Sequence, residues 1–139
     1  MRTLHFGLRV ADRERSTAFY EALGYEVVGT VPQTRFGHLS MLMLPGDEFV
    51  AIELVHDPAA APPGPGPNHF VIKVESMAET VADLEAKGVA VDGLGSPDGS
   101  EQFLTAWVTD PDGNRIELVQ WPPGHPDGLH PSIWADGEG

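Results

Sequence analysis

The order of apolar and polar residues repeats along the chain with a shift of 64 positions. Each copy opens with a segment in which apolar and polar residues alternate, 3–10 in the first and 69–74 in the second, as in a half-buried strand. A stretch with helical spacing follows and stops at a glycine, Gly24 or Gly88. Because the shift also places histidine on histidine and glutamate on glutamate, a chance match of apolar residues does not explain the repeat.

Three further strand-like segments complete each copy, so the predicted order of elements is βαβββ, twice. In the first helix, Ala18, Phe19, Ala22 and Leu23 form the expected apolar stripe, and in the second Val81 and Leu84 face inward. The strand-like segments cover about 25–30, 37–44 and 49–55, then about 89–93, 103–109 and 114–121. A strong turn signal, Asp110-Pro111-Asp112-Gly113, precedes the last one. We expect an α+β fold in which two tandem βαβββ modules form a curved mixed β-sheet around a shared site.

The chain is expected to be a single domain over 1–139. Module 1 covers about 2–56 and module 2 about 68–121. The linker between them, about 57–67, contains five prolines and is predicted to be a semi-rigid spacer. The tail, 122–139, has no periodicity and is expected to be partly ordered at best.

Composition and charge exclude several classes of function. Eight Lys and Arg against 21 Asp and Glu give a net charge of −13, which argues against binding to nucleic acid or to an anionic membrane. The chain has no cysteine, which excludes disulfides, thiolate metal sites and cysteine nucleophiles. No apolar run approaches the roughly 20 residues of a membrane helix. The N-terminus lacks the layout of a signal peptide. We therefore expect a soluble, cytoplasmic protein.

Strand alternation places two histidines and two glutamates on the surface that the helices do not cover. His5 and His69 lie out of phase with the apolar residues of the opening strands, and Glu53 and Glu117 lie out of phase with those of the closing strands. Each histidine precedes its glutamate by 48 positions. If the first and last strands of a module are neighbours, each module brings one imidazole and one carboxylate together. A pseudo-twofold axis would then bring the two pairs together. The apolar residues predicted to pack under the first helix are Leu4, Phe6, Leu8 and Val10.

Two imidazoles and two carboxylates form a donor set suited to a divalent cation. Four protein ligands plus water fit octahedral Ni, Co or Mn, and Zn also binds such a set because first-row metals separate poorly on affinity alone. The other histidines, His38, His56, His125 and His130, have no counterpart in the repeat. We interpret them as surface or structural residues, with His38 alone as a pocket candidate.

The paired modules with this histidine and glutamate pattern resemble the vicinal oxygen chelate superfamily, and within it bacterial glyoxalase I, the lactoylglutathione lyases. The resemblance covers about residues 2 to 121 and includes the phrases LHFGLRVADRERSTAFYEALGYEVV, AIELV, NHFVIKV and DPDGNRIELV. Methylmalonyl-CoA epimerases of the superfamily usually carry Gln where Glu53 stands, and ring-cleaving dioxygenases typically use three ligands. The four-ligand set therefore favours the glyoxalase interpretation.

The resemblance implies a metal held by His5, Glu53, His69 and Glu117. The substrate would be the hemithioacetal of methylglyoxal and a thiol, converted through an enediolate into a thioester, a reaction that detoxifies methylglyoxal. Glu117 would carry the proton between the two carbons, with Glu53 as its pseudo-symmetric alternative. The resemblance also implies a homodimer with the site at or near the interface.

Residues that would contact the thiol agree only in part with those of relatives that use glutathione. Arg9 matches an arginine that such relatives place near the glutamyl carboxylate. Asp57 stands where they often have Asn, and an acid there would repel a carboxylate. The loop 95–102 carries two acids and no base where those relatives supply a cation. Phe103 and Trp107 point to the same face of their strand and are expected to line the pocket. The acids near the expected thiol site leave a different thiol, or a different substrate, as an open alternative.

Two other functions are compatible with this superfamily. One is a metal enzyme acting on another substrate, such as an epimerase or a dioxygenase. The other is a protein that binds a ligand without catalysis, as bleomycin-resistance proteins do, and it requires no metal ligands. The four-residue donor set favours an enzyme over a binding protein.

Overall fold

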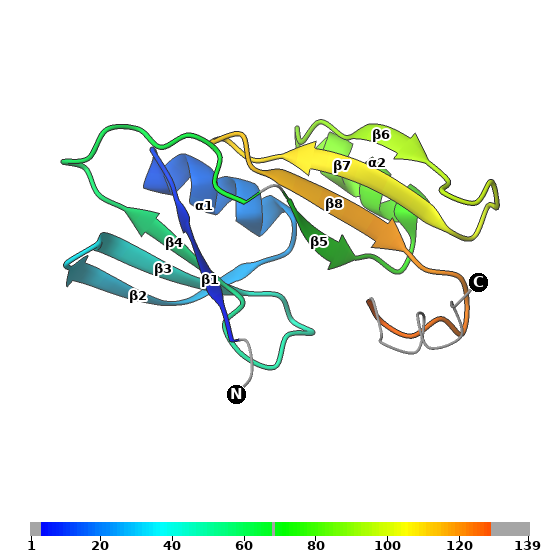
Figure 1. Cartoon of the computed structure of the whole chain (residues 1–139), viewed down its shortest axis with the longest axis horizontal. Helices are drawn as coiled ribbons and strands as arrows, with labels where there is room; N and C mark the ends of the chain where they lie inside the picture. The colour runs from blue at the N-terminus through cyan, green and yellow to red at the C-terminus, as the bar shows by residue number, and fades with distance from the viewer. Residues whose placement is uncertain (1–3, 68, 129–139) are drawn as a thin grey trace, which may run out of the picture.

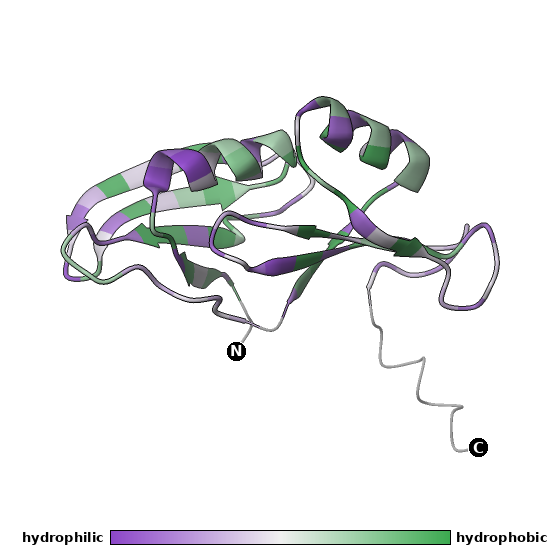
Figure 2. Ribbon diagram, turned by 90° about the horizontal axis from the view of Figure 1, so that it is seen from above, coloured by the Kyte–Doolittle hydropathy of each residue, from purple (hydrophilic) through white to green (hydrophobic). Residues whose placement is uncertain are grey.

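The computed structural model describes residues 4–67 and 69–128 (Figure 1). It contains two four-stranded sheets, each covered on one face by a helix, and both helices lie on the same side of the molecule (Figure 2). The observed order of elements is βαβββ, twice, which confirms the α+β prediction. The first module contains β1 (Phe6–Arg9), α1 (Arg13–Ala22), β2 (Glu26–Thr34), β3 (Gly37–Met43) and β4 (Ile52–His56). The second contains β5 (Phe70–Lys73), α2 (Met77–Ala86), β6 (Asp92–Gly95), β7 (Leu104–Thr109) and β8 (Arg115–Gln120).

The first and last strands of each module are neighbours, which meets the condition set above for bringing each histidine to its glutamate. The strand orders are β1-β4-β3-β2 and β5-β8-β7-β6, with the first pair of each sheet parallel and the others antiparallel. The register of the two parallel pairs is the same after the shift of 64, because Gly7 lies opposite Glu53 and Val71 lies opposite Glu117. The prediction of one curved sheet is wrong in one respect: within the described residues, the modules form two separate sheets.

Both helices begin with a side-chain cap. Asp12 accepts a hydrogen bond from the backbone N–H of Arg15 at 3.0 Å, and Ser76 accepts one from that of Glu79 at 3.3 Å. Such caps satisfy N–H groups that the first helical turn leaves unpaired. Gly24 and Gly88 follow the helices at φ values of +109° and +80°, which a residue with a side chain rarely adopts.

The core lies between the helices and the sheets. Leu8 and Val10 are buried there as predicted. Leu4 and Phe6 are 57% and 40% exposed, so their predicted burial under α1 is wrong. Leu4 precedes β1, and the ring of Phe6 instead meets Phe70 edge to face, with the ring centroids 5.3 Å apart. The two opening strands therefore meet at the junction of the modules.

The predicted turn before β8 joins the two modules. The buried Asp110 accepts hydrogen bonds on Oδ2 from the Tyr20 hydroxyl at 2.7 Å and from Asn114 Nδ2 at 2.9 Å. Asp112 accepts hydrogen bonds from the backbone N–H of Ala11 and from the Ser16 hydroxyl. We call Asp110, Asp112 and Asn114 the inter-module clip, because they fasten α1 and its N-terminal residues to module 2. Burial and the neighbouring Asp110 raise the pKa of Tyr20 above its usual range.

The proline-rich linker is held against the same turn. The backbone N–H of Gly66 donates to Asn114 Oδ1 at 2.8 Å, so the linker is anchored at its C-terminal end. Within residues 4–67 and 69–128, none of the helices is long and apolar enough to cross a membrane. His130 and the rest of the tail from 129 onward lie outside the described residues.

Candidate metal centre

The first histidine–glutamate pair forms where β1 and β4 begin. His5 directly precedes β1 and lies two residues before Gly7, the register partner of Glu53, so both side chains emerge from the same face. His5 Nε2 lies 2.8 Å from Glu53 Oε2. The imidazole is 41% and the carboxylate 17% exposed, so a ligand can approach both.

The second pair repeats this arrangement on β5 and β8. His69 Nε2 lies 3.5 Å from Glu117 Oε2, and the two side chains are 37% and 23% exposed. Trp107, the register partner of Glu117 on β7, meets the His69 ring edge to face at 5.2 Å. The Arg115 guanidinium lies 5.0 Å from the centroid of the Trp107 ring. Trp107 therefore lies beside this pair, and its contact with a substrate stays a prediction.

The two pairs remain apart within one chain. Among the residues that the structure describes, no group of three or more His, Cys, Asp or Glu side chains is placed to hold a metal ion. Each module therefore carries one nitrogen and one oxygen donor, half of the predicted set. The pseudo-twofold meeting of the pairs does not occur inside the single chain.

A cavity of about 380 Å³ adjoins the first pair. Its wall includes Glu53, Arg9 and Asp57, together with residues of the linker and of the β2–β3 turn. From that turn come Arg35 and Phe36, with the Arg35 guanidinium 4.7 Å from the centroid of the Phe36 ring. Sequence reasoning missed Arg35 because it has no counterpart in the repeat. The only signal was an arginine next to an aromatic residue in a turn, in a chain with few cations.

Asp57 has a structural partner as well as a place in this cavity. Its Oδ1 accepts a hydrogen bond from the backbone N–H of Ala59 at 3.0 Å and so shapes the start of the linker. Arg9 and Arg35 also line this cavity. Two positively charged residues therefore share the cavity with Asp57, which weakens the argument that this acid excludes a carboxylate.

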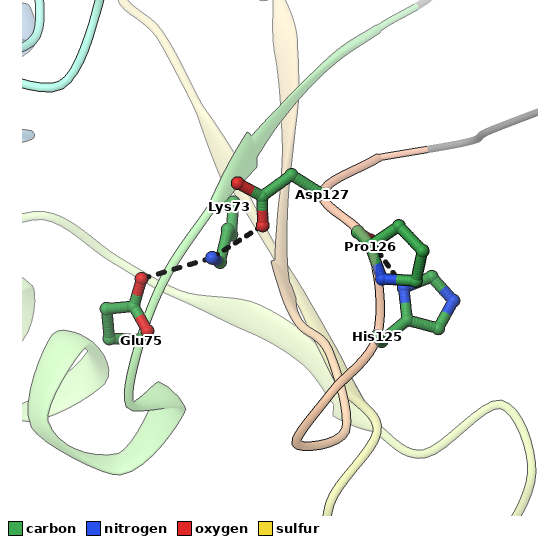
Figure 3. Close-up of polar contacts among 5 residues, drawn as sticks. All are labelled: Lys73, Glu75, His125, Pro126 and Asp127. Atoms are coloured by element: carbon green, nitrogen blue, oxygen red, sulfur yellow. Dashed lines mark hydrogen bonds and ion pairs between the residues drawn. The ribbon is translucent and has the colours of Figure 1, made fainter.

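The counterpart of Arg9 in the second module is Lys73, and its surroundings differ. Lys73 Nζ contacts Asp127 Oδ1 at 2.6 Å and Glu75 Oε1 at 3.2 Å (Figure 3). These acids raise the pKa of Lys73 above its usual value, the Asp127 hydrogen bond contributing most. Arg9 thus lines the cavity of module 1, whereas Lys73, the corresponding residue of module 2, forms ion pairs with two acids.

Phe103 and the acidic loop have structural contacts of their own. The Phe103 ring stacks on Trp121 at 5.1 Å, and Trp121 stacks on His125 at 4.2 Å. In the loop, Asp98 accepts hydrogen bonds from Ser100 and Ser96, and those from Ser100 most strongly hold the pKa of its carboxyl below the usual value. That Phe103 lines the substrate pocket stays a prediction. Asp98 stabilises the loop to which it belongs.

Comparisons with known proteins agree on one family. The model of the "Glyoxalase/Bleomycin resistance protein/Dioxygenase superfamily" matches residues 2–118. The lactoylglutathione lyase of Salmonella typhimurium is 31% identical, over 86% of this chain and 93% of its own length. A probable chloroplastic lactoylglutathione lyase of Arabidopsis thaliana is 32% identical over 86% of this chain, which spans 35% of that protein.

Solved structures show the same similarity. A trypanothione-dependent glyoxalase I of Leishmania major has 31% identity and a TM-score of 0.68, with 86% of each chain covered. TnmS3, an antibiotic binding protein from Streptomyces sp. CB03234, has 28% identity and a TM-score of 0.63, covering 88% of this chain and 98% of its own.

Proposed function

This chain belongs to the glyoxalase/bleomycin resistance protein/dioxygenase superfamily, and we propose that it is a metal-dependent enzyme of the glyoxalase I type. It would convert the hemithioacetal of methylglyoxal and a thiol into a thioester. One observation carries the proposal: His5 with Glu53 and His69 with Glu117 occupy equivalent positions on the uncovered faces of two repeated sheets. A protein that only sequesters a ligand needs no such pairs.

The four side chains suit a divalent metal ion in their chemistry. They supply two imidazole nitrogens and two carboxylate oxygens, and the carboxylates balance a charge of 2+. We assign His5, Glu53, His69 and Glu117 as its ligands, with Ni, Co or Zn as the metal and Mn also compatible. When bound, the metal supplies Lewis-acid stabilisation of negative charge on the two neighbouring oxygens of the substrate.

A homodimer would supply the complete donor set. Since one chain keeps its two pairs apart, module 1 of one chain would face module 2 of its partner, and the twofold axis would generate two equivalent sites. Exposed apolar side chains adjoin both pairs: Leu4 and Phe6 flank His5, and Val71 shares its strand face with His69. Burial of these residues against a partner would stabilise the dimer.

Glu117 is our candidate for the group that moves the proton. Its carboxylate would accept the proton from one substrate carbon and return it to the neighbouring carbon. The distance of 3.5 Å to His69 is longer than the 2.8 Å between Glu53 and His5, so Glu117 is the less tightly held of the two. Trp107 packs beside it and would shield the transferred proton from water.

The thiol would bind in the cavity of module 1. Arg9 is our candidate for contacting a carboxylate of the thiol. Arg35, from the β2–β3 turn, is a second arginine that lines the same cavity. In module 2 the corresponding cation, Lys73, is paired with Glu75 and Asp127. The substrate would therefore lie in one orientation, with the thiol on the module 1 side.

The direct test is turnover after metal exchange. Protein stripped of metal is reloaded with Ni, Co, Mn, Zn or Fe(II) and mixed with methylglyoxal and glutathione, and thioester formation is followed in the ultraviolet. We expect metal-dependent product, and its loss in Glu117→Gln with metal still bound. The exposed Glu75→Gln, outside the four ligands, is the matched control. Tight metal binding without product from any thiol would refute glyoxalase chemistry.

Mixing two inactive variants tests the dimer. One chain carries His5→Ala with Glu53→Ala and the other carries His69→Ala with Glu117→Ala. If sites form across chains, each mixed dimer regains one intact site, and random reassortment restores about a quarter of the original activity. No recovery after confirmed exchange of subunits would show that sites do not form across chains.

A further inference from the structure

Two histidines without counterparts in the repeat lie together on the opposite face of the first sheet. His38 on β3 and His56 on β4 are direct cross-strand partners. They share their strand faces with the buried Ser40 and Leu54, which places them on the face that α1 covers. Glu53 lies on the other face of β4, so this histidine pair is separate from the candidate metal centre.

We propose that His38 and His56 form a second metal site, a two-histidine site for a borderline divalent cation such as Cu²⁺, Zn²⁺ or Ni²⁺. Directly opposed residues of an antiparallel pair have Cβ atoms about 4.5–5.5 Å apart, so two imidazoles can reach one ion. Imidazole nitrogen is a donor that these metals prefer. The site rests on residues outside the proposed catalytic machinery.

The hydrogen bonding of His56 prepares it to bind a metal. Its Nδ1 lies 3.3 Å from the carbonyl oxygen of Val10, which can only accept, so Nδ1 carries the proton. The lone pair is thereby fixed on Nε2. A backbone carbonyl that holds one ring N–H in this way is the arrangement that commonly orients metal-binding histidines.

His38 contains a polar atom that lacks a partner. Within the described residues, its Nδ1 is buried and makes no hydrogen bond. A buried polar atom without a partner costs free energy, and such atoms mark places where an ion can bind. Burial, together with the nearby Arg13 and His56, lowers the pKa of His38.

The backbone holds the two histidines in place. Gly37 has φ +108°, and a Cβ at this position would lie 2.3 Å from the carbonyl oxygen of His56. The end of the β2–β3 turn is therefore pressed against the end of β4. Thr34 stabilises that turn by donating to the carbonyl oxygen of Gly37 at 2.8 Å.

The cavity around the pair is open to solvent. It has a volume of about 770 Å³ and is lined by His38 and His56 together with the start of α1. The charged residues of its wall are Asp12, Glu14 and Arg13. No third His, Cys, Asp or Glu within residues 4–67 and 69–128 completes a larger group, so water would fill the remaining positions. Such a site binds Cu²⁺ most tightly among the divalent first-row metals.

The experiment isolates this site from the candidate metal centre. In the full chain carrying His5→Ala and His69→Ala, we expect one Cu²⁺ per chain with an electron paramagnetic resonance spectrum showing two nitrogen ligands. Adding His38→Asn or His56→Asn should weaken binding at least about tenfold, a change of 1.4 kcal/mol. His125→Asn is the matched control, because His125 lies in the aromatic stack with Trp121. Equal binding in all three variants, or none in the parent chain, would overturn the proposal.

A second measurement uses the unmodified chain, which guards against variants that fail to fold. Zn²⁺ is added beyond the amount that fills the candidate metal centre, and the ring ¹⁵N shifts of the histidines are followed by nuclear magnetic resonance. Saturable shifts at His38 and His56 support the site. Unchanged shifts at both residues would refute it.

Discussion

The hydrogen bond from Tyr20 to Asp110 is the strongest single test of how the modules are joined. In Tyr20→Phe the ring is kept and only the hydroxyl is lost, so packing in the core is preserved. Asp110 Oδ2 then keeps Asn114 Nδ2, and Oδ1 keeps two backbone N–H donors, from Asp112 and Asn114. The carboxyl group therefore loses one of four donors.

The magnitude follows from these contacts. A hydrogen bond to a charged group contributes about 1.5–3 kcal/mol, and the three remaining donors favour the lower half of that range, about 1.5–2 kcal/mol. The unfolding entropy is about 2.1 cal/mol/K per residue, which gives about 0.29 kcal/mol/K for a chain of this length. We therefore expect Tyr20→Phe to lower the melting temperature by about 5–7 °C.

Thermal unfolding followed by circular dichroism at pH 7 measures this shift. Tyr25→Phe is the matched control, since Tyr25 is also buried and contacts the Tyr20 ring but takes no part in the inter-module clip. A melting temperature lowered equally in both variants, or unchanged in Tyr20→Phe, would refute the reasoning.

The pH dependence gives a second readout. Burial and Asp110 raise the pKa of Tyr20 in the folded protein above the unfolded value of about 10, so the folded state binds the phenolic proton more tightly. This contribution to stability is complete below about pH 10 and is lost as the pH rises above it. The stability of the original chain should therefore fall more steeply above pH 10 than that of Tyr20→Phe, and parallel profiles would argue against this role.

Three further predictions concern the module 1 cavity and the turn beside it. Asp57→Asn should lower the KM for the glutathione hemithioacetal, because Arg9 and Arg35 would no longer share their charge with an acid; an unchanged or higher KM would remove Asp57 from thiol recognition. Arg35→Gln should raise that KM severalfold with little change in kcat, and steady-state kinetics showing a loss of kcat alone would contradict a binding role. Gly37→Ala should destabilise the fold by about 1–3 kcal/mol in urea unfolding, because its φ is positive and the added Cβ would meet the His56 carbonyl; a neutral effect would show that the turn can move.

The repeat and the strand alternation were sufficient to predict the histidine–glutamate pairs. The alternation along the strands placed His5 and Glu53 on one face of module 1. The equal spacing of His69 and Glu117 placed that second pair at the equivalent position in module 2. The sequence could not predict where the two pairs lie relative to each other, because a repeat defines each module but not how modules are arranged. The separation of the two pairs within one chain depends on how the modules pack against each other, which is a matter of tertiary structure.

The buried face of α1 was predicted less well. The apolar stripe included Ala18, which is exposed, whereas the fully buried residues of the helix are Ser16 and Tyr20. Both are polar, and their hydroxyls are satisfied by Asp112 and Asp110. A pattern of apolar residues cannot reveal a buried polar group whose partner lies about 90 residues away in the chain.

The parallel pairing of β1 with β4 also determines when the protein can fold during synthesis. The sheet of module 1 cannot form until β4 has been made, since β1 has no other neighbour among the described strands. The hydrogen bond from the Tyr20 hydroxyl to Asp110 can form only after Asp110 has emerged from the ribosome. A unit of roughly 55 residues with an unpaired hydroxyl in its core is only marginally stable alone. The nascent first module is therefore the species most exposed to misfolding, and the docking of the Asp110 turn is the step that ends that risk.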